Sequence, residues 1–291
     1  MVLAYLAVCG YLALSLTQPV RRLIDPFPAS LGVHAETIAF PSRIDAIPLD
    51  GWLVSPAESA PASRPVVMVH GRGSDREHEV GGRAPEIAAR LAHEGHPTLL
   101  FDLRGSGRSG GKRFTLGAQE VRDVGAAVDF LARRGLAPQG VDLLGFSMGA
   151  ATSMLTAAHE PRVRAVVEDS GYADLGDVLN DQVPKASGLP RWFTPGVVFM
   201  AWPLMGVNAY AIRPIDGLPA LAARGVPLLV IHGEGDTLVP VGHGRRLAAA
   251  YGPGVETYFV PGAAHVGSFK VDPETYLARL TAFLAGAEAP R

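Results

Sequence analysis

The sequence predicts an α/β fold built on a doubly wound, mostly parallel sheet, and three observations lead to this prediction. Short apolar runs recur along the chain, as in strands that are buried on both faces. Stretches of helical periodicity separate them, and such alternation favours right-handed crossovers between parallel strands. The chain has 291 residues, of which 48% are hydrophobic. A single large core therefore suffices, and a second domain is not required.

The first element is an uncharged segment, residues 2–17. As a helix it would span roughly 25 Å, near the lower limit for crossing a bilayer. No Lys or Arg precedes it and no clear small-x-small motif comes after it, so a membrane anchor is favoured, with a cleaved signal peptide as the alternative. Arg21 and Arg22 slightly favour a cytoplasmic position for the domain on their C-terminal side. We expect an anchor or signal-like segment at 1–18, a linker at 19–31 and the folded domain at 32–291.

The predicted strands begin with two alternating segments, Glu36–Phe40 and Ile44–Val54, which indicate an antiparallel pair. A stretch of loop composition comes next, at Ala57–Arg64. The apolar runs that predict parallel strands are Val66–His70, Thr98–Asp102, Val141–Phe146, Val163–Val167, Val226–His232 and Glu256–Val260. Helical stripes lie at Val121, Val124, Val128 and Leu131, within Met148–His159, and at Tyr276, Leu277, Leu280, Phe283 and Leu284.

The interval from about Glu168 to Gly225 is longer than one crossover helix requires. It is also more apolar than a plain connection should be. We interpret about 172–214 as a small helical cap. The alternative is that these residues complete the core or contact a membrane surface.

Charge and metal-ligand content exclude several classes of function. The formal net charge is −2 and no extended basic stripe is present, so nucleic acid is not an expected partner. Cys9 is the single cysteine, which excludes a disulfide framework within the chain. The histidines show no HExxH or comparable spacing, so neither a metal nor another cofactor is expected. The sequence makes no prediction about oligomeric state.

The most informative motif is Gly145-Phe146-Ser147-Met148-Gly149, which directly follows a predicted strand and opens a predicted helix. This is the GxSxG pattern of a nucleophile elbow, in which a tight turn exposes the serine and glycines avoid clashes on either side. Ser147 is therefore the predicted nucleophile.

Two later loops supply predicted partners for this serine. Asp236 follows the strand at 228–232, and His265 follows the next strand, so both lie at carboxyl ends of the sheet. A serine hydroxyl needs a base to remove its proton, and that base needs an anion to fix its tautomer. We predict His265 as the base and Asp236 as the acid, with Glu234 and Asp169 as alternative acids.

An oxyanion, the negatively charged oxygen formed during attack on a carbonyl, needs hydrogen-bond donors. The turn His70-Gly71-Arg72-Gly73 follows the first predicted parallel strand. We predict the backbone N–H groups of Arg72 and Met148 as the donors, with Gly73 as the alternative to Arg72.

Taken together, the His70–Gly73 turn, the elbow, Asp236 and His265 resemble the α/β-hydrolase fold family over roughly residues 32–286. The resemblance implies an eight-stranded sheet and a hydrolase or esterase-like activity. It is nearest to bacterial membrane-anchored or exported serine hydrolases with a prolyl-oligopeptidase-like or serine-aminopeptidase-like core. Arg72 stands where the HGGG loop of some lipases has glycine.

A second glycine pattern, Gly105 to Gly110, matches GxGxxG literally. A dinucleotide-binding motif requires a helix to open within the motif, whereas the next predicted helix starts only near Gly117. We interpret this segment as a loop.

The resulting hypothesis is a serine hydrolase that cleaves a small-molecule carboxylic ester through an acyl-enzyme. The apolar cap residues Trp192, Phe193, Phe199 and Trp202 are the predicted substrate-binding residues. Thioester or amide cleavage would use the same residues. A membrane-tethered binding domain without catalysis is the alternative from another class.

Overall fold

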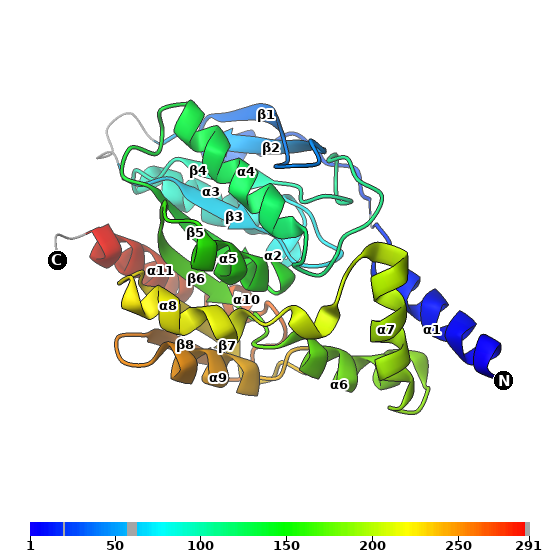
Figure 1. Ribbon diagram of the computed structural model, residues 1–291. Helices are drawn as coiled ribbons and strands as arrows, with labels where there is room; N and C mark the ends of the chain where they lie inside the picture. The colour runs from blue at the N-terminus through cyan, green and yellow to red at the C-terminus, as the bar shows by residue number, and fades with distance from the viewer. Residues whose placement is uncertain (20, 57–62, 289–291) are drawn as a thin grey trace.

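The centre of the computed structural model, which describes residues 1–19, 21–56 and 63–288, is an eight-stranded sheet (Figure 1). The strand order is β1-β2-β4-β3-β5-β6-β7-β8. β2 runs antiparallel to both of its neighbours, and the remaining pairs are parallel. The predicted doubly wound, mostly parallel sheet is therefore confirmed. The strands are β1 (Ala35–Pro41), β2 (Pro48–Val54), β3 (Val66–Val69), β4 (Thr98–Phe101), β5 (Val141–Phe146), β6 (Val163–Asp169), β7 (Leu228–Gly233) and β8 (Glu256–Val260).

Helices cover both faces of the sheet (Figure 1). Successive side chains of a strand point to opposite faces, so β3 contributes Val67 and Val69 to one core and Val66 and Met68 to the other. The first core includes residues of α4 (Glu120–Arg133), α5 (Met148–His159), α8 (Leu218–Ala223) and α9 (Gly242–Tyr251). The second includes residues of α2 (Glu79–Gly82), α3 (Ala84–His93), α10 (Ser268–Val271) and α11 (Pro273–Glu288). This double cover explains why the central strands read as continuous apolar runs.

Two elements begin later along the chain than the sequence predicts. The predicted strand at 44–54 begins only at Pro48, because residues 42–47 form a turn with positive φ at Ile44 and Ala46. Residues 105–110 form a turn closed by Gly105 N donating to Gly110 O at 2.7 Å, and the helix after it begins at Glu120. Residue 20 of the predicted linker, residues 57–62 of the predicted loop and residues 289–291 of the predicted domain lie outside the described residues.

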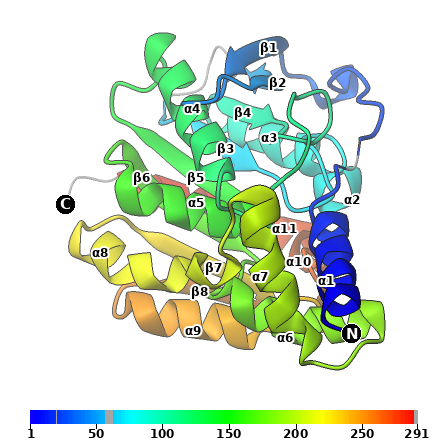
Figure 2. The same ribbon diagram turned by 45° about the vertical axis from the view of Figure 1, so that its right-hand side comes forward.

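A helical layer stands beside the carboxyl ends of the strands. It contains α1 (Val2–Leu16), α6 (Leu175–Ser187) and α7 (Phe193–Met205), with 3₁₀ turns at Ala209–Ala211 and Pro214–Gly217. α1 lies alongside α7, although nearly two hundred residues separate them in the chain (Figure 2). α6 and α7 occupy the interval that the sequence assigns to a cap. A further 3₁₀ turn at Ala29–Leu31 precedes β1.

The described residues contain no single helix with the length and hydropathy needed to cross a bilayer. One bent pair, Phe193–Met205 with Ala209–Ala223, meets the criteria jointly across a bend of 98°.

Parallel pairing brings the ends of distant strands to one edge. β3 leads into Gly71, β5 into Ser147, β7 into Asp236 and β8 into His265. Ligands of open α/β sheets bind at this edge, so the chemistry of the chain depends on how these four loops meet.

Candidate active site

Ser147 occupies a strained turn between β5 and α5. Its backbone has φ 52° and ψ −115°, a region that costs a non-glycine residue about 1–3 kcal/mol. Ser147 N donates to the Asp169 carbonyl at 2.8 Å, and Ala151 N donates to the Ser147 carbonyl at 3.1 Å. The turn is therefore fixed from β6 on one side and from α5 on the other.

The two glycines of the motif allow α5 to approach the sheet closely. A Cβ atom at Gly145 would lie 2.4 Å from the carbonyl oxygen of Gly149, and one at Gly149 would lie 2.0 Å from that of Val69. No side chain fits at either distance. The steric role expected of these glycines from the sequence is therefore present in the structure.

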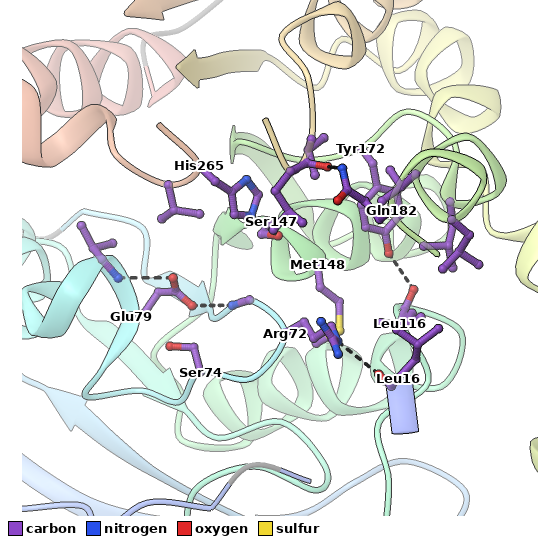
Figure 3. Close-up of a pocket in the computed structure, with 18 of the residues that line it drawn as sticks. Leu16, Arg72, Ser74, Glu79, Leu116, Ser147, Met148, Tyr172, Gln182 and His265 are labelled. Atoms are coloured by element: carbon purple, nitrogen blue, oxygen red, sulfur yellow. Dashed lines mark hydrogen bonds between the residues drawn. The ribbon is translucent and has the colours of Figure 1, made fainter. Parts of the chain in front are cut away.

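The three residues predicted to act together are in hydrogen-bond contact. His265 Nε2 lies 2.8 Å from Ser147 Oγ, and His265 Nδ1 lies 2.7 Å from Asp236 Oδ2. Figure 3 shows the imidazole directly above the serine. The hydroxyl, imidazole and carboxylate thus form one continuous chain, although 118 residues separate the first two.

Asp236 is held as a charged carboxylate. Burial alone would raise its pKa, but hydrogen bonds with His232 and His265 outweigh burial and bring the pKa below its usual range. Its Oδ1 also accepts from the backbone N–H groups of Leu238 and Val239, at 2.9 and 2.8 Å. The acid therefore has one oxygen fixed by its own loop and the other aimed at His265.

His232 supports the acid from inside the protein. Its Nε2 lies 2.7 Å from the Val239 carbonyl oxygen and 3.5 Å from Asp236 Oδ2, and the side chain is fully buried. Burial alone would lower the pKa of His232, but the hydrogen bonds with Asp236 and with the Val239 carbonyl raise it. The neighbouring histidine thus adds positive potential behind the carboxylate.

Two further carboxyl groups lie at the end of β6. Burial raises the pKa of Glu168 to about 8 and that of Asp169 to about 6. Glu168 Oε2 accepts from Gly171 N at 2.8 Å, whereas its buried Oε1 has no partner among the described residues. Asp169 accepts from the hydroxyls of Ser170 and Tyr276.

The alternative acids weighed from the sequence occupy other environments. The side-chain hydrogen bonds of Asp169 go to Ser170 and Tyr276 rather than to His265. Glu234 forms an exposed ion pair with Arg245 at 3.2 Å. Of the three acids, Asp236 is the one whose carboxylate meets the imidazole.

The glycine turn after β3 abuts the serine. A Cβ at Gly71 would lie 3.2 Å from Ser147 Cβ, and Gly71 N donates to Glu79 Oε2 at 2.5 Å. Arg72 and Met148 line the same cavity as Ser147 (Figure 3). Within the described chain the Arg72 amide donates no hydrogen bond, and Met148 opens α5, where N–H groups lack helical partners.

A cavity of about 340 Å³ opens above these groups. Apolar side chains form most of its wall, and they come from α1, from α6 and from loops at the carboxyl edge. They include Leu16, Leu116, Leu175, Val178, Leu179, Leu238, Val239 and Val266. The polar exceptions include Glu79, Gln182 and Tyr172, whose hydroxyl donates to the Leu116 carbonyl at 2.6 Å.

The structure does not bring the predicted substrate-binding residues to this cavity. Trp192, Phe193, Phe199 and Trp202 lie at the start of α7 and along it, and none belongs to the cavity lining. Trp192, Phe199 and Trp202 are exposed, while Phe193 stacks on Tyr5 of α1 and on Trp192. The physical reason is that α6, rather than α7, is the cap helix that lines the cavity above the serine.

One group of side chains has the spacing of a metal site, at the opposite end of β5. His96, Asp142 and Glu288 place one potential ligand atom each within 4.8 Å of the others. The guanidinium of Arg64 already pairs with one of these groups, because Arg64 Nε donates to Asp142 Oδ1 at 3.0 Å, and the backbone N–H of Arg64 donates to Glu288 Oε1. Burial raises the pKa of Asp142 to about 7, and a half-protonated carboxyl is a weak ligand.

Sequence reasoning missed Leu16, Glu79 and the pair Glu168 and His232. Glu79 and Glu168 lie in stretches with no motif. His232 is the last residue but one of β7, and no local pattern indicates that its ring lies under the Asp236 loop. Leu16 belongs to the segment predicted to be an anchor, so a place in the cavity wall was not expected.

Comparisons with known proteins bear on the family and the fold of this chain. A family model described as "Alpha/beta hydrolase family" matches residues 66–279. The uncharacterized protein YfhR of Escherichia coli K12 is 24% identical over 278 residues, which cover 94% of this chain and 87% of YfhR. The uncharacterized protein Rv2307c of Mycobacterium tuberculosis is 27% identical over 267 residues, covering 91% and 83%.

Among solved structures, the esterase Pf2001 of Pyrococcus furiosus superimposes with a TM-score of 0.74 and 25% identity, over 92% of this chain and 99% of the esterase. Est1E of Butyrivibrio proteoclasticus shares the fold, with a TM-score of 0.66 at 17% identity, over 87% and 99%.

Proposed function

This chain belongs to the alpha/beta hydrolase family, and we propose that it is a serine hydrolase that cleaves carboxylic esters. The observation that carries the proposal is the chain of two hydrogen bonds, 2.8 and 2.7 Å long, that joins Ser147, His265 and Asp236. The structural likeness to the Pyrococcus furiosus esterase supports an ester as the substrate.

In the first half of the reaction Ser147 Oγ attacks the ester carbonyl carbon while His265 Nε2 accepts the hydroxyl proton. The Asp236 carboxylate accepts a hydrogen bond from the Nδ1–H of His265 and stabilises the imidazolium that forms. The carbonyl oxygen becomes an oxyanion, which accepts hydrogen bonds from the N–H groups of Arg72 and Met148. The imidazolium then gives its proton to the alcohol, which leaves, and the acyl group stays on Ser147.

In the second half of the reaction a water molecule takes the place of Ser147 as the nucleophile. His265 accepts a proton from water, the hydroxide adds to the acyl carbon, and the returned proton releases Ser147 and a carboxylic acid. The apolar wall of the cavity favours an uncharged acyl group of short or medium length.

The test is labelling by a fluorophosphonate together with turnover of p-nitrophenyl acyl esters of several lengths. We expect wild type to be labelled and to hydrolyse the esters. Ser147→Ala should lose labelling entirely and about 10⁴-fold or more in kcat, since single removals in serine triads cost this much. Ser153→Ala is the matched control, because that serine is buried in α5 outside the cavity lining.

Two outcomes would change the proposal. A folded wild type that is neither labelled nor active on any acyl length points to a binding domain without catalysis, the alternative from another class. Labelling with preference for a thioester or an amide over esters keeps the nucleophile and corrects the substrate class.

A further inference from the structure

Helix α1 carries apolar surface that its packing leaves uncovered. It has 15 residues without a charged side chain, and only Cys9, Gly10 and Ala13 are buried. Val2, Leu3 and Tyr11 are 71%, 84% and 69% exposed. A helix that is apolar all round is normally surrounded by apolar material.

Helix α7 has the same character. No charged residue occurs from Phe193 to Met205, and Phe199 and Trp202 are 59% and 66% exposed. Trp192, directly before the helix, is 61% exposed. We call Leu3, Tyr11, Trp192, Phe199 and Trp202 the α1–α7 face, because Leu3 and Tyr11 lie on one side of α1.

The two helices form a fixed pair. A Cβ at Gly196 of α7 would lie 2.3 Å from the hydroxyl of Tyr5 and 2.6 Å from the sulfur of Cys9, so α1 and α7 touch closely. The Tyr5 hydroxyl donates to the Trp192 carbonyl at 3.1 Å, and the two rings stack. The exposed side chains of the two helices are therefore held in a fixed arrangement relative to one another.

The inner end of α1 reaches the catalytic cavity. Arg113 donates to the Leu14 carbonyl at 3.0 Å, and Arg72 Nε donates to the Leu16 carbonyl at 3.1 Å (Figure 3). Leu16 itself lines the cavity that contains Ser147. The uncharged helix α1 thus connects the α1–α7 face to the wall of the cavity.

The charge and shape of the α1–α7 face indicate which kind of partner it binds. The face has no charge of its own, two of the three tryptophans in the chain lie on it, and Trp and Tyr prefer the boundary between lipid and water. At its edge the exposed cations Arg191 and Lys185 share the single acid Asp181, which leaves net positive charge to meet phosphate headgroups. The outer half of α1 projects beyond the rest of the molecule (Figure 1), and fluid lipid adapts to such a projection.

We propose that the α1–α7 face seats this protein on a lipid bilayer without spanning it, and that the acyl chain of a lipid ester passes from the bilayer along Leu16 into the cavity. The second part rests on the proposed ester hydrolysis, whereas the first does not. α1 lies in the interface with α7 in this arrangement, in place of the single span expected from the sequence.

The binding test uses the full chain and vesicles of phosphatidylcholine and phosphatidylglycerol. Trp52 is buried, so a fluorescence change on binding reports on Trp192 and Trp202. We expect cosedimentation with the vesicles, a blue shift of emission and quenching by brominated acyl chains. Leu3→Ser with Tyr11→Ser should weaken partitioning at least about tenfold, because two apolar side chains lose their burial.

The matched control is Ile44→Ser with Val271→Ser, which replaces exposed apolar residues elsewhere at 86% and 53% exposure. It should bind vesicles as wild type does. A wild type that stays in the supernatant, or a Leu3/Tyr11 variant that binds equally well, overturns the seating surface. A concentration-dependent dimer that the same variant abolishes, without vesicle binding, assigns the face to a second copy of this chain instead.

The delivery step is tested by turnover of a long-chain ester embedded in vesicles against a soluble short-chain p-nitrophenyl ester. The Leu3/Tyr11 variant should lose at least about tenfold on the embedded ester and stay within about twofold of wild type on the soluble one. Equal loss on both substrates overturns delivery. Absence of all turnover and of fluorophosphonate labelling, with vesicle binding intact, rejects the proposed hydrolysis and leaves the seating surface standing.

Discussion

The floor and the wall of the cavity are built in different ways. The floor consists of Ser147 and His265 with Asp236 behind them, and their polar atoms are fixed by hydrogen bonds of 2.7–2.9 Å and by a strained backbone at the serine. The wall is formed mainly by aliphatic side chains such as Leu16 of α1 and Leu179 of α6. The function of the floor thus depends on the direction of its hydrogen bonds, and that of the wall on the volume its side chains leave free.

This difference separates two kinds of function. Directional contacts determine which reaction is possible, because proton transfer requires heavy atoms within hydrogen-bond reach. A wall of dispersion contacts discriminates weakly, by about 1–3 kcal/mol per methylene, and so sets preference among related substrates. Changes in the floor should therefore alter rates for every substrate, and changes in the wall should alter the order of substrates.

The largest expected effect comes from Asp236→Asn. An amide in this place no longer fixes the His265 tautomer or stabilises the imidazolium, and we expect a loss of about 10⁴-fold in kcat for all acyl lengths. Steady-state hydrolysis of p-nitrophenyl esters measures it. Glu234→Gln, a carboxylate two residues away that pairs with Arg245 at the surface, is the control and should stay near wild type. Similar losses in both variants would mean that the distinction between these acids is incorrect.

The next effect concerns the protonation of Glu168, which is buried at the end of β6. Burial raises the pKa of Glu168 from the ordinary 4.5 to about 8, so at neutral pH the folded chain holds a proton that the unfolded chain releases. The stabilisation that Glu168 contributes is fully present below the pKa that this group has in the unfolded chain. It is lost as the pH rises through the pKa that the group has in the folded chain. The free energy of unfolding should fall by about 1 kcal/mol per pH unit between about pH 5 and pH 8.

Glu168→Gln keeps the shape of the protonated side chain and removes the titration. The melting temperature of the variant relative to wild type should therefore increase with pH across this window. Leu179→Met in the uncharged wall is the control, and its difference from wild type should be independent of pH. Parallel curves for Glu168→Gln and wild type would show that the group titrates normally in the folded state.

The same contrast explains what the sequence could predict. The elbow and the loops with Asp236 and His265 are local patterns at the ends of apolar strands, and a parallel sheet necessarily gathers those ends at one edge. The sheet and the residues of the floor could therefore be predicted. Glu168 on β6 and His232 on β7 lie on neighbouring strands, and which residues meet across strands depends on register, which no local pattern encodes.

The wall could not be predicted for a related reason. Leu16 reaches the cavity only because α1 packs on α7, a contact between segments almost two hundred residues apart. The aromatic residues of α7 were expected at the cavity because they are apolar, but apolarity does not specify which partner a helix face meets. In this chain α6 lines the cavity, and α7 presents its aromatic residues outward.

The smallest expected effect tests the wall itself. Leu179 is 7% exposed and lines the cavity beside the helix layer, so Leu179→Trp should narrow the space for an acyl chain. We expect kcat/KM for a p-nitrophenyl octanoate to fall about tenfold relative to the acetate, or about 1.4 kcal/mol, while the acetate is little changed. Leu179→Met conserves volume and should preserve the wild-type order. Equal losses on both esters would place Leu179 among the residues that support the floor, because only a disturbed triad lowers turnover without regard to the length of the substrate.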